Sequence, residues 1–189
     1  MFLFYRDLLI KSIRSYIKIF PIENISFYHN DVIVTVSSCY LLQILKFLKQ
    51  HMHTQFHILV SITVVDYLQN ANRFELSYEL LSLKFNNRIR IKVSLNELSF
   101  ITSCENLFSA ATWYECEVWD MFGVYFTNHK NLKRILTDYG FEGFPLRKDF
   151  PLCGLVEIQF NELRKRIVTD SIELTQEYRT FNFSSPWGT

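Results

Sequence analysis

Hydrophobic residues in the first part of the chain recur with the spacing of strands and of a helix in turn. Residues 32–36 are typical of a short strand, and Ser37 and Ser38 follow as candidates for a helix N-cap. The apolar positions that come next have helical spacing: Leu41, Ile44, Leu45, Leu48 and Met52. Residues 56–67 alternate again, which predicts a strand with one face made of Phe56, Ile58, Val60, Ile62 and Val64.

Residues 73–85 and 88–95 give the clearest β-hairpin signal. Apolar residues alternate with charged ones on both strands, so the glutamates of the first strand and the basic residues of the second lie on one side. Asn86 and Asn87 tolerate the positive φ that a two-residue turn requires. Together these elements predict an α+β fold, in which a mostly antiparallel sheet has helices packed on one face.

Helical spacing returns over residues 106–122, with one face made of Tyr114, Val118, Met121 and Phe122. Gly123 is a natural stop for this helix. Residues 131–136 predict a further short helix that Asn131 caps. Residues 155–160 and 164–168 can pair as a small hairpin.

Glycine and proline divide the chain into two parts. All five glycines follow residue 122, and so do three of the four prolines. We therefore assign residues 1–126 to an α+β domain and residues 127–189 to an extended, turn-rich C-terminal arm. The end of the arm shows no period, so we expect a partner protein to cover its aromatic side chains, Phe181, Phe183 and Trp187.

Residues 1–22 carry four basic residues and a single acid, Asp7. Organelle-targeting peptides have this composition, and so does the first amphipathic helix of many domains. We favour the helix, because no separate serine-rich segment precedes the core. Its apolar side consists of Leu9, Ile13, Tyr16 and Phe20.

The composition is that of a globular protein, with 49% hydrophobic and 21% charged residues. A net charge of +1 provides no field that would recruit nucleic acid or an anionic membrane. The longest apolar run, residues 58–65, is far shorter than the roughly 20 residues of a membrane-spanning helix. The first 122 residues contain no glycine, which excludes a glycine-rich phosphate-binding turn there.

The sequence offers little for metal binding. Its cysteines contain no CxxC pair and lie at Cys39, Cys104, Cys116 and Cys153. We interpret them as reduced thiols and expect no iron–sulfur cluster in this chain. His51, His53 and His57 have no neighbouring cysteine or carboxylate cluster, so we interpret them as a solvated helix end.

Charged residues gather in the middle of the chain. The acids are Glu115, Glu117, Asp120, Asp138 and Asp149, and the bases are Lys133, Arg134, Arg147 and Lys148. Glu117 and Asp120 can share a helix face. With Asp138 they form the candidate site of an alternative function, a free metal-dependent hydrolase. We favour the other interpretation, in which ion pairs fix a glycine-rich loop on the helix.

Three segments of this region carry a specific resemblance: residues 113–123 (WYECEVWDMFG), 134–143 (RILTDYGFEG) and 145–151 (PLRKDFP). Over residues 56–187 the chain resembles the mitochondrial type of the 30 kDa subunit family of respiratory complex I, the NADH:ubiquinone oxidoreductase. The positions that carry the motif are Trp113, Tyr114, Glu115, Glu117, Trp119, Asp120, Gly123, His129, Arg134, Asp138, Gly140, Gly143, Pro145, Arg147, Lys148, Asp149, Phe150 and Pro151.

The resemblance implies a structural subunit of the peripheral arm of the proton-pumping complex. It implies no catalytic, cofactor-binding or metal-binding residue in this chain, so the enzyme is the complex, whose FMN, iron–sulfur clusters, NADH and ubiquinone belong to other subunits. It also implies an arm packed along the neighbouring quinone-site subunit, on the matrix side of the mitochondrial inner membrane, and it is compatible with an organelle-encoded chain. A related subunit of a hydrogenase-type or plastid complex is a further alternative.

Three positions depart from the pattern of the family. Cys116 occupies a position where arginine is usual, Lys130 one where proline is usual, and Phe144 one where histidine is usual. The missing arginine puts the charge compensation of Glu115 and Glu117 in doubt.

Overall fold

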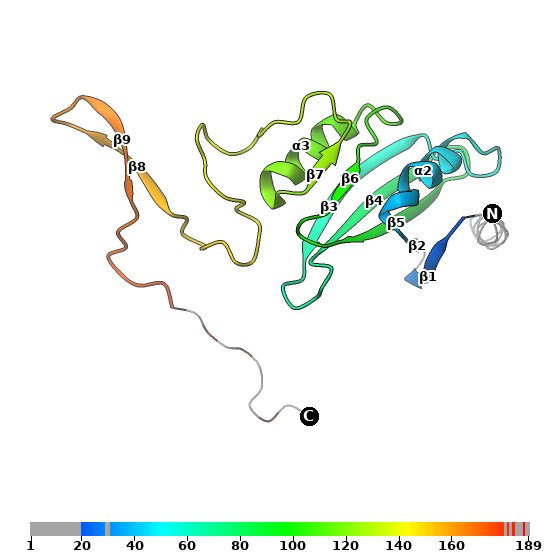
Figure 1. Ribbon diagram of the computed structural model, residues 1–189, viewed down its shortest axis with the longest axis horizontal. Coiled ribbons are helices and arrows are strands. Elements are labelled where there is room, and N and C mark those ends of the chain that lie inside the picture. The colour runs from blue at the N-terminus through cyan, green and yellow to red at the C-terminus, as the bar shows by residue number, and fades with distance from the viewer. Residues whose placement is uncertain (1–19, 29–30, 180, 182, 184–186, 188–189) are drawn as a thin grey trace. The chain divides into compact units, whose positions relative to one another are not determined.

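The computed structural model of the chain describes residues 20–28, 31–179, 181, 183 and 187 (Figure 1). The helix expected over residues 1–22 therefore lies mostly outside the described part. Its expected end is wrong, because Phe20 and Pro21 are not helical and Ile22 begins a strand. Contacts within the chain form two compact units, residues 1–148 and residues 149–189. Residues 127–148 make their contacts in the first unit, so the arm expected from residue 127 begins with a stretch that packs on the domain.

The first unit contains a five-stranded sheet with the strand order β1-β2-β5-β4-β3. Its strands are β1 (Ile22–Tyr28), β2 (Asp31–Val36), β3 (Ile58–Asp66), β4 (Phe74–Ser82) and β5 (Asn87–Leu95). Neighbouring strands are antiparallel except β2 and β5, which are parallel. The described part of this unit also contains a small parallel pair, β6 (Phe100–Thr102) and β7 (Tyr125–Thr127).

Two α-helices lie in the described part of the first unit, α2 (Leu41–Gln50) and α3 (Ala111–Phe122) (Figure 1). Both pack on the same face of the sheet. Ile91 of β5 lines a cleft with residues of α2, and its partner in β4 is Tyr78. Phe74 alternates onto the face of Tyr78, and its ring meets that of Phe122 in α3, with 6.4 Å between centroids. The predicted α+β class, with helices on one face of a mostly antiparallel sheet, is confirmed.

The β4–β5 hairpin confirms the alternation of its sequence. Its core-facing residues are buried: Phe74, Leu76, Tyr78, Leu80, Ile89, Ile91, Val93 and Leu95. On the opposite face Arg90 pairs with Glu79 at 2.6 Å and Lys92 pairs with Glu75 at 2.7 Å. The predicted two-residue turn is wrong, because Ser82 pairs with Asn87 and leaves a four-residue loop, 83–86, in which Asn86 has the expected positive φ of 49°.

The predicted face of β3 is correct at Ile62 and Val64 but wrong at Ile58 and Val60, because the strand contains a bulge. The register shifts between Leu59 and Ser61, so the alternation changes sides within the strand. Leu59 and Ile62 are buried, whereas Val60 is 45% exposed. The carbonyl of Val60 instead accepts a hydrogen bond of 2.7 Å from the Tyr114 hydroxyl of α3.

Helix ends differ from the expectation in three places. A 3₁₀ turn (Ser38–Tyr40) precedes α2, no side chain caps that helix, and Met52 lies beyond its end with 70% exposure. The third helix begins at Ala111 rather than at residue 106. The short helix expected at residues 131–136 is absent from the described structure, since this segment binds a carboxylate of α3 instead. Gly123 ends α3 as predicted, in the left-handed conformation with φ 77°.

The second unit contains the predicted hairpin, formed by β8 (Val156–Asn161) and β9 (Arg166–Ser171). The four residues between the strands end with Lys165 at φ 50°. From Ile172 to Arg179 the structure assigns no strand or helix.

Candidate functional site

Asp120 is the centre of the charged region that the sequence singled out. Its side chain is fully buried at the inner side of α3. One oxygen accepts hydrogen bonds from the Arg134 guanidinium at 3.0 Å and from the Thr137 hydroxyl at 2.6 Å. The other accepts from three successive backbone N–H groups, those of residues 135–137, at 2.8–3.1 Å. A single carboxylate therefore holds the segment after β7 on the helix.

These hydrogen bonds decide the ionisation of Asp120. Burial alone would raise its pKa, but the Thr137 hydroxyl, the backbone N–H groups and Arg134 outweigh burial and lower the pKa to about 2. Glu117 and Asp138 are exposed, and Asp138 accepts a hydrogen bond from the N–H of the next residue at 2.7 Å. Since every lone pair of Asp120 has a donor, this carboxylate has no capacity for a divalent ion or a substrate proton. The geometry gives no support to the hydrolase alternative.

A second network joins the sheet to the end of the first unit. Arg73 binds the buried Asp66 through two nitrogens, at 2.8 and 3.0 Å, and Glu97 at 3.3 Å. Glu97 also pairs with Arg147 at 2.6 Å, and the backbone N–H of Lys148 donates to Asp66 at 2.9 Å. The hydrogen bond from Arg73 is the main cause of the lowered pKa of Asp66.

Gly123 follows the last residue of α3 and lies beside Arg147 of this network. Arg147 donates from Nε to the carbonyl of Phe122 at 2.6 Å, and its guanidinium stacks on the ring of Phe144, 4.5 Å from the centroid. A Cβ atom at Gly123 would lie 2.6 Å from the Phe144 ring and 2.7 Å from Arg147. Only glycine allows this approach, and its positive φ makes the turn. Phe144, a departure from the family pattern, thus provides an aromatic ring on which Arg147 stacks. The centroid of this ring lies 5.7 Å from that of the Trp119 ring.

Glu115 centres a third, fully buried network. It accepts hydrogen bonds from the Ser103 hydroxyl, the Cys104 backbone N–H at 2.7 Å and the Cys104 thiol at 3.1 Å. Nε2 of His129 lies 3.9 Å from its carboxylate. Burial raises the pKa of Glu115 in spite of these donors. The donors that follow β6 and β7 therefore offset only part of the cost of burying this carboxylate.

His129 connects this network to the loop after β7. The N–H of Asn131 donates to Nδ1 at 3.1 Å, so Nδ1 accepts a hydrogen bond and Nε2 carries a proton. Nε2 lies 3.3 Å from the carbonyl of Thr112 and 3.9 Å from the sulfur of Cys116. Lys130, the second departure, pairs with Glu105 through its side chain at 3.5 Å and its backbone N–H at 3.1 Å.

The cysteines do not gather into a ligand set. Cys104 and Cys116 are buried, while Cys39 and Cys153 are exposed. Burial, then the charge of Glu115, raises the pKa of Cys104, which opposes the thiolate form that metals bind. Within the ranges that the structure describes, no group of three His, Cys, Asp or Glu side chains could hold a metal ion. The rings of His51 and His53 lie 5.5 Å apart just after α2.

The second unit exposes a one-sided apolar surface. The register of the β8–β9 hairpin places six residues on one face: Val156, Ile158, Phe160, Ile167, Thr169 and Ser171. The other face carries mainly polar residues: Glu157, Gln159, Asn161, Arg166, Val168 and Asp170. The four large side chains of the first set are 55–69% exposed. We call this set the hairpin apolar face.

Motif residues outside the networks are mostly exposed. Trp113 is 65% exposed, and Gly140, Gly143, Asp149 and Pro151 are exposed as well. Tyr114, Trp119, Pro145 and Phe150 are half-buried. Of the tail aromatics, Phe181 is 64%, Phe183 92% and Trp187 90% exposed, and the rings of Phe181 and Phe183 lie 6.2 Å apart.

Sequence patterns did not indicate several members of the networks: Asp66, Arg73, Glu97, Ser103 and Thr137. They are ordinary polar residues at strand ends and in loops, far from their partners along the chain. A charged residue at the end of an otherwise apolar strand, such as Asp66, is the one signal that could have marked them.

Fold and site together define a small α+β domain whose buried charges hold loops in place, followed by a hairpin with an exposed apolar face. The profile of the family described as respiratory-chain NADH dehydrogenase, 30 Kd subunit, matches residues 34–155. A protein of Reclinomonas americana, NADH-ubiquinone oxidoreductase subunit 9, is 50% identical over 175 residues, 92% of this chain and 86% of that protein. NADH dehydrogenase (ubiquinone) iron-sulfur protein 3 of Beta trigyna is 55% identical over 148 residues, 78% of this chain and 77% of that protein.

The chain belongs to the 30 kDa subunit family of the respiratory-chain NADH dehydrogenase. Among solved structures, a chain of the membrane-bound sulfane sulfur reductase, an archaeal respiratory membrane complex, has a similar fold with a TM-score of 0.66. It is 22% identical, and the match covers 75% of this chain and 85% of that one. The α+β fold therefore recurs at low sequence identity.

Proposed function

We propose that this chain is a structural subunit of the peripheral arm of the proton-pumping NADH:ubiquinone oxidoreductase, respiratory complex I. The observation that carries the proposal is the family match over residues 34–155, which includes all three charged networks. In these networks the carboxylates of Asp66, Glu115 and Asp120 are buried and accept hydrogen bonds from loops. Such groups stabilise a rigid surface and leave the chemistry to other subunits.

The chain supports electron transfer from NADH to ubiquinone without a cofactor of its own. FMN and the iron–sulfur clusters of the complex belong to other subunits, as do the sites for NADH and ubiquinone. Two of the four thiols support this assignment, since Cys104 donates to Glu115 and Cys116 lies beside His129 and the carbonyl of Asn131. The name of the Beta trigyna relative contains the words iron-sulfur protein, and we take these words as a description of that relative and not of this chain.

The arm, residues 127–189, docks on neighbouring subunits of the complex, above all the quinone-site subunit. The hairpin apolar face supports this, because an isolated two-stranded hairpin is marginally stable in water and needs a surface to pack on. Phe181, Phe183 and Trp187 extend the exposed aromatic area toward the C-terminus. Exposed apolar patches of this kind mark protein interfaces.

As a subunit of this complex, the chain would lie on the matrix side of the mitochondrial inner membrane. Organellar homologues support this location, and they also support an organelle gene as the source of the chain. In the part of the chain that the structure describes, every helix is too short or too polar to cross a bilayer. The complex as a whole would hold this subunit at the membrane.

A matched pair of substitutions in β8 tests the docking of the arm. Ile158→Ser removes an apolar side chain from the hairpin apolar face, and Glu157→Ser changes the adjacent residue on the polar face. Because both side chains are exposed, neither change should unfold the first unit. Native gels of mitochondrial membranes, stained for NADH dehydrogenase activity, measure how much of each variant co-migrates with the complex.

We expect Ile158→Ser to lower co-migration clearly and Glu157→Ser to leave it near the unmodified level. Equal incorporation of both variants would contradict docking through the hairpin apolar face. A chain found solely as a free monomer in intact membranes would contradict the proposed function itself.

A further inference from the structure

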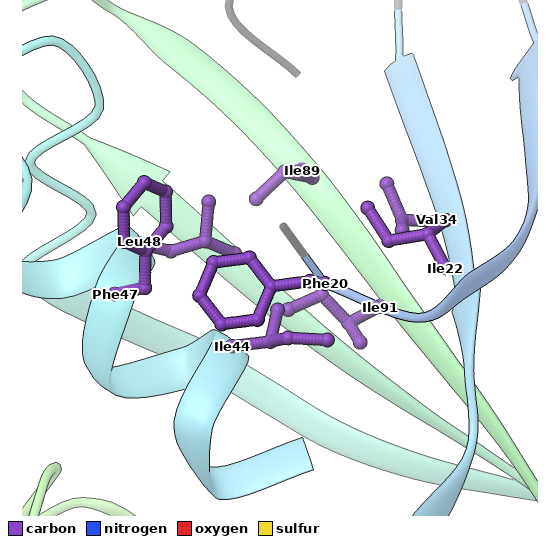
Figure 2. Close-up of a pocket in the computed structure, with 8 residues that line it drawn as sticks. All are labelled: Phe20, Ile22, Val34, Ile44, Phe47, Leu48, Ile89 and Ile91. Carbon is purple, nitrogen blue, oxygen red and sulfur yellow. The ribbon is translucent and has the colours of Figure 1, made fainter. Parts of the chain in front are cut away.

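The small cleft between β1 and α2 has no polar chemistry to offer a ligand (Figure 2). All eight residues that line it are apolar, and the rings of Phe20 and Phe47 lie 5.0 Å apart in its wall. Small-molecule sites need a few placed polar groups in addition. The buried group whose titration the proposed function does not use is Glu115, which lies between α3 and the segments that follow β6 and β7.

The Glu115 carboxyl is sealed from solvent. Its side chain and that of His129 are both fully buried. Three residues that face them are at most 4% exposed: Tyr78, Ser103 and Cys104. In the described part of the chain no lysine or arginine pairs with this carboxyl, and the nearby Lys130 pairs with Glu105 instead. A negative charge on Glu115 therefore lacks the cation that buried carboxylates need.

The two oxygens of Glu115 have different surroundings. Oε1 accepts hydrogen bonds from the backbone N–H of Cys104, at 2.7 Å, and from its thiol, at 3.1 Å. Oε2 faces the Ser103 hydroxyl, whose oxygen accepts a hydrogen bond of 3.1 Å from the N–H of Glu105. A hydroxyl oxygen has two lone pairs, so the hydrogen bond between Ser103 and Oε2 can reverse its direction. A proton on Oε2 therefore removes neither hydrogen bond at Oε1.

His129 has no comparable room for a second proton. Nδ1 accepts the N–H of Asn131 at 3.1 Å, and the protonated Nε2 lies 3.3 Å from the carbonyl of Thr112. A proton on Nδ1 would face the N–H of Asn131 and end the hydrogen bond that shapes the loop after β7. In water an imidazole binds a proton more tightly than a carboxylate, by about two pH units. The contacts of this cluster oppose that order.

The electrostatics of the cluster act in the same direction. Burial, the largest cause, raises the pKa of Glu115, and its hydrogen bonds and the charge of a protonated His129 lower it by less. Burial also raises the pKa of Tyr78 and that of Cys104 well above their ordinary values, so both groups stay neutral at pH 7. The other titratable groups beside the pair are a thiol and one ion pair: Cys116, Glu105 and Lys130.

We propose that the proton taken up by the Glu115–His129 pair resides on Oε2 of Glu115, and that the pair is a pH-sensitive switch for the loop after β7. While Glu115 is protonated, the cluster is neutral and Asn131 keeps its hydrogen bond to Nδ1. Once the proton leaves, the buried carboxylate draws a proton to Nδ1 of His129 or water into the cluster. Both responses loosen the loop, the first by ending the contact with Asn131.

The sign of the pH dependence follows from the raised pKa of Glu115. Because this pKa is higher in the folded chain, the proton adds most to the free energy of unfolding below the ordinary value of 4.5. That contribution is lost as the pH rises through the folded pKa. Asp120 behaves in the opposite way, since its lowered pKa gives a contribution that is lost on acidification. The loop after β7 should therefore open on the alkaline side.

NMR titration of the full chain, with isotope-labelled glutamate and histidine side chains, locates the proton. Glu115→Gln assigns the carboxyl signal, and His129→Gln assigns the ring signals. Between about pH 8 and about pH 5 we expect Glu115 to take up its proton above the ordinary 4.5, while Nδ1 of His129 stays unprotonated. Uptake by Nδ1 while Glu115 remains a carboxylate would overturn the proposal.

Hydrogen exchange of the Asn131 amide tests the switch, with rates corrected for the intrinsic effect of pH. Glu115→Gln is a neutral isostere of the protonated carboxyl, and the exposed Glu117→Gln on the same helix is its matched control. From about pH 6 to about pH 8, we expect protection to fall about tenfold in the unmodified chain and in Glu117→Gln, but to stay within about twofold in Glu115→Gln. The same pH dependence in both variants would contradict the switch.

His129→Gln keeps the test decisive if Glu115→Gln does not fold. Its amide can accept the N–H of Asn131 but cannot become a cation. Glu115 should still take up its proton above the ordinary 4.5 in this variant, and loss of that uptake would place the proton on His129. All these measurements use the full chain outside the complex, so a failure of complex assembly would concern the proposed function only.

Discussion

Gly123 offers the sharpest test of how the loop after α3 is held, and Gly140 offers its control. Both residues have positive φ, 77° and 72°. A Cβ at Gly123 would lie 2.6 Å from two ring atoms of Phe144 and 2.7 Å from Arg147, whereas a Cβ at Gly140 would have no atom within 4 Å. Alanine therefore meets the same backbone strain at both positions and a steric conflict at one.

The magnitudes follow from these two differences. The left-handed conformation costs an alanine about 1–2 kcal/mol, so Gly140→Ala should lower the free energy of unfolding by about 1 kcal/mol once the stiffer unfolded chain is included. Crowding a packed site adds about 1–3 kcal/mol, so Gly123→Ala should lower it by about 2–4 kcal/mol. Part of that loss comes from Arg147, whose contacts with Phe122, Glu97 and the Phe144 ring must shift.

Urea unfolding of the two variants and the unmodified chain, followed by tryptophan fluorescence, measures the difference. Equal slopes of free energy against urea would show that the unfolded states are comparable. A Gly123→Ala variant no less stable than Gly140→Ala would refute the argument, because it would mean that Phe144 and Arg147 do not press on the helix end.

Three further predictions concern the networks and one buried hydroxyl. Asp120→Asn should destabilise the chain by about 2–4 kcal/mol at pH 7, since an amide cannot accept all five hydrogen bonds. The pKa of Asp120 is about 2 in the folded chain, below the ordinary 3.8, so above pH 4 its charge adds about 2 kcal/mol to the free energy of unfolding. This contribution is lost as the pH falls through 2. Acid unfolding of the Asp120→Asn variant should lack that loss. Arg73→Lys should lower the free energy of unfolding by about 1–3 kcal/mol, because it breaks the two-point contact with buried Asp66. Arg90→Lys, at a partly exposed ion pair, should lower it by less than about 1 kcal/mol. Similar losses for the two variants in denaturant unfolding would contradict this. Ser82→Ala should be neutral or stabilising by up to about 1 kcal/mol in the same assay, because the Ser82 hydroxyl is buried without a hydrogen-bond partner, and a clear destabilisation would show that it has one.

The corrections to the predicted elements share one physical origin. The bulge in β3 and the four-residue loop of the hairpin depend on how neighbouring strands pair, which the alternation of a single strand does not contain. Residues 131–136 have the spacing of a helix, but the N–H groups of residues 135–137 bind Asp120 instead of continuing a helical turn. A buried carboxylate thus outweighed a weak local preference.

The sequence by itself determined the α+β class, the apolar faces of β4 and β5, the stop at Gly123, the β8–β9 hairpin and, through the motif at residues 113–151, the family. These features follow from local spacing or from residue identity, so they can be recognised along one chain. Only the tertiary structure decided what the charged residues do. Asp66 meets the backbone of Lys148, 82 positions away, and Asp120 is enclosed by a loop that begins beyond β7. Whether a carboxylate is a ligand, a catalyst or a structural acceptor depends on which donors surround it in space, and folding alone brings those donors together.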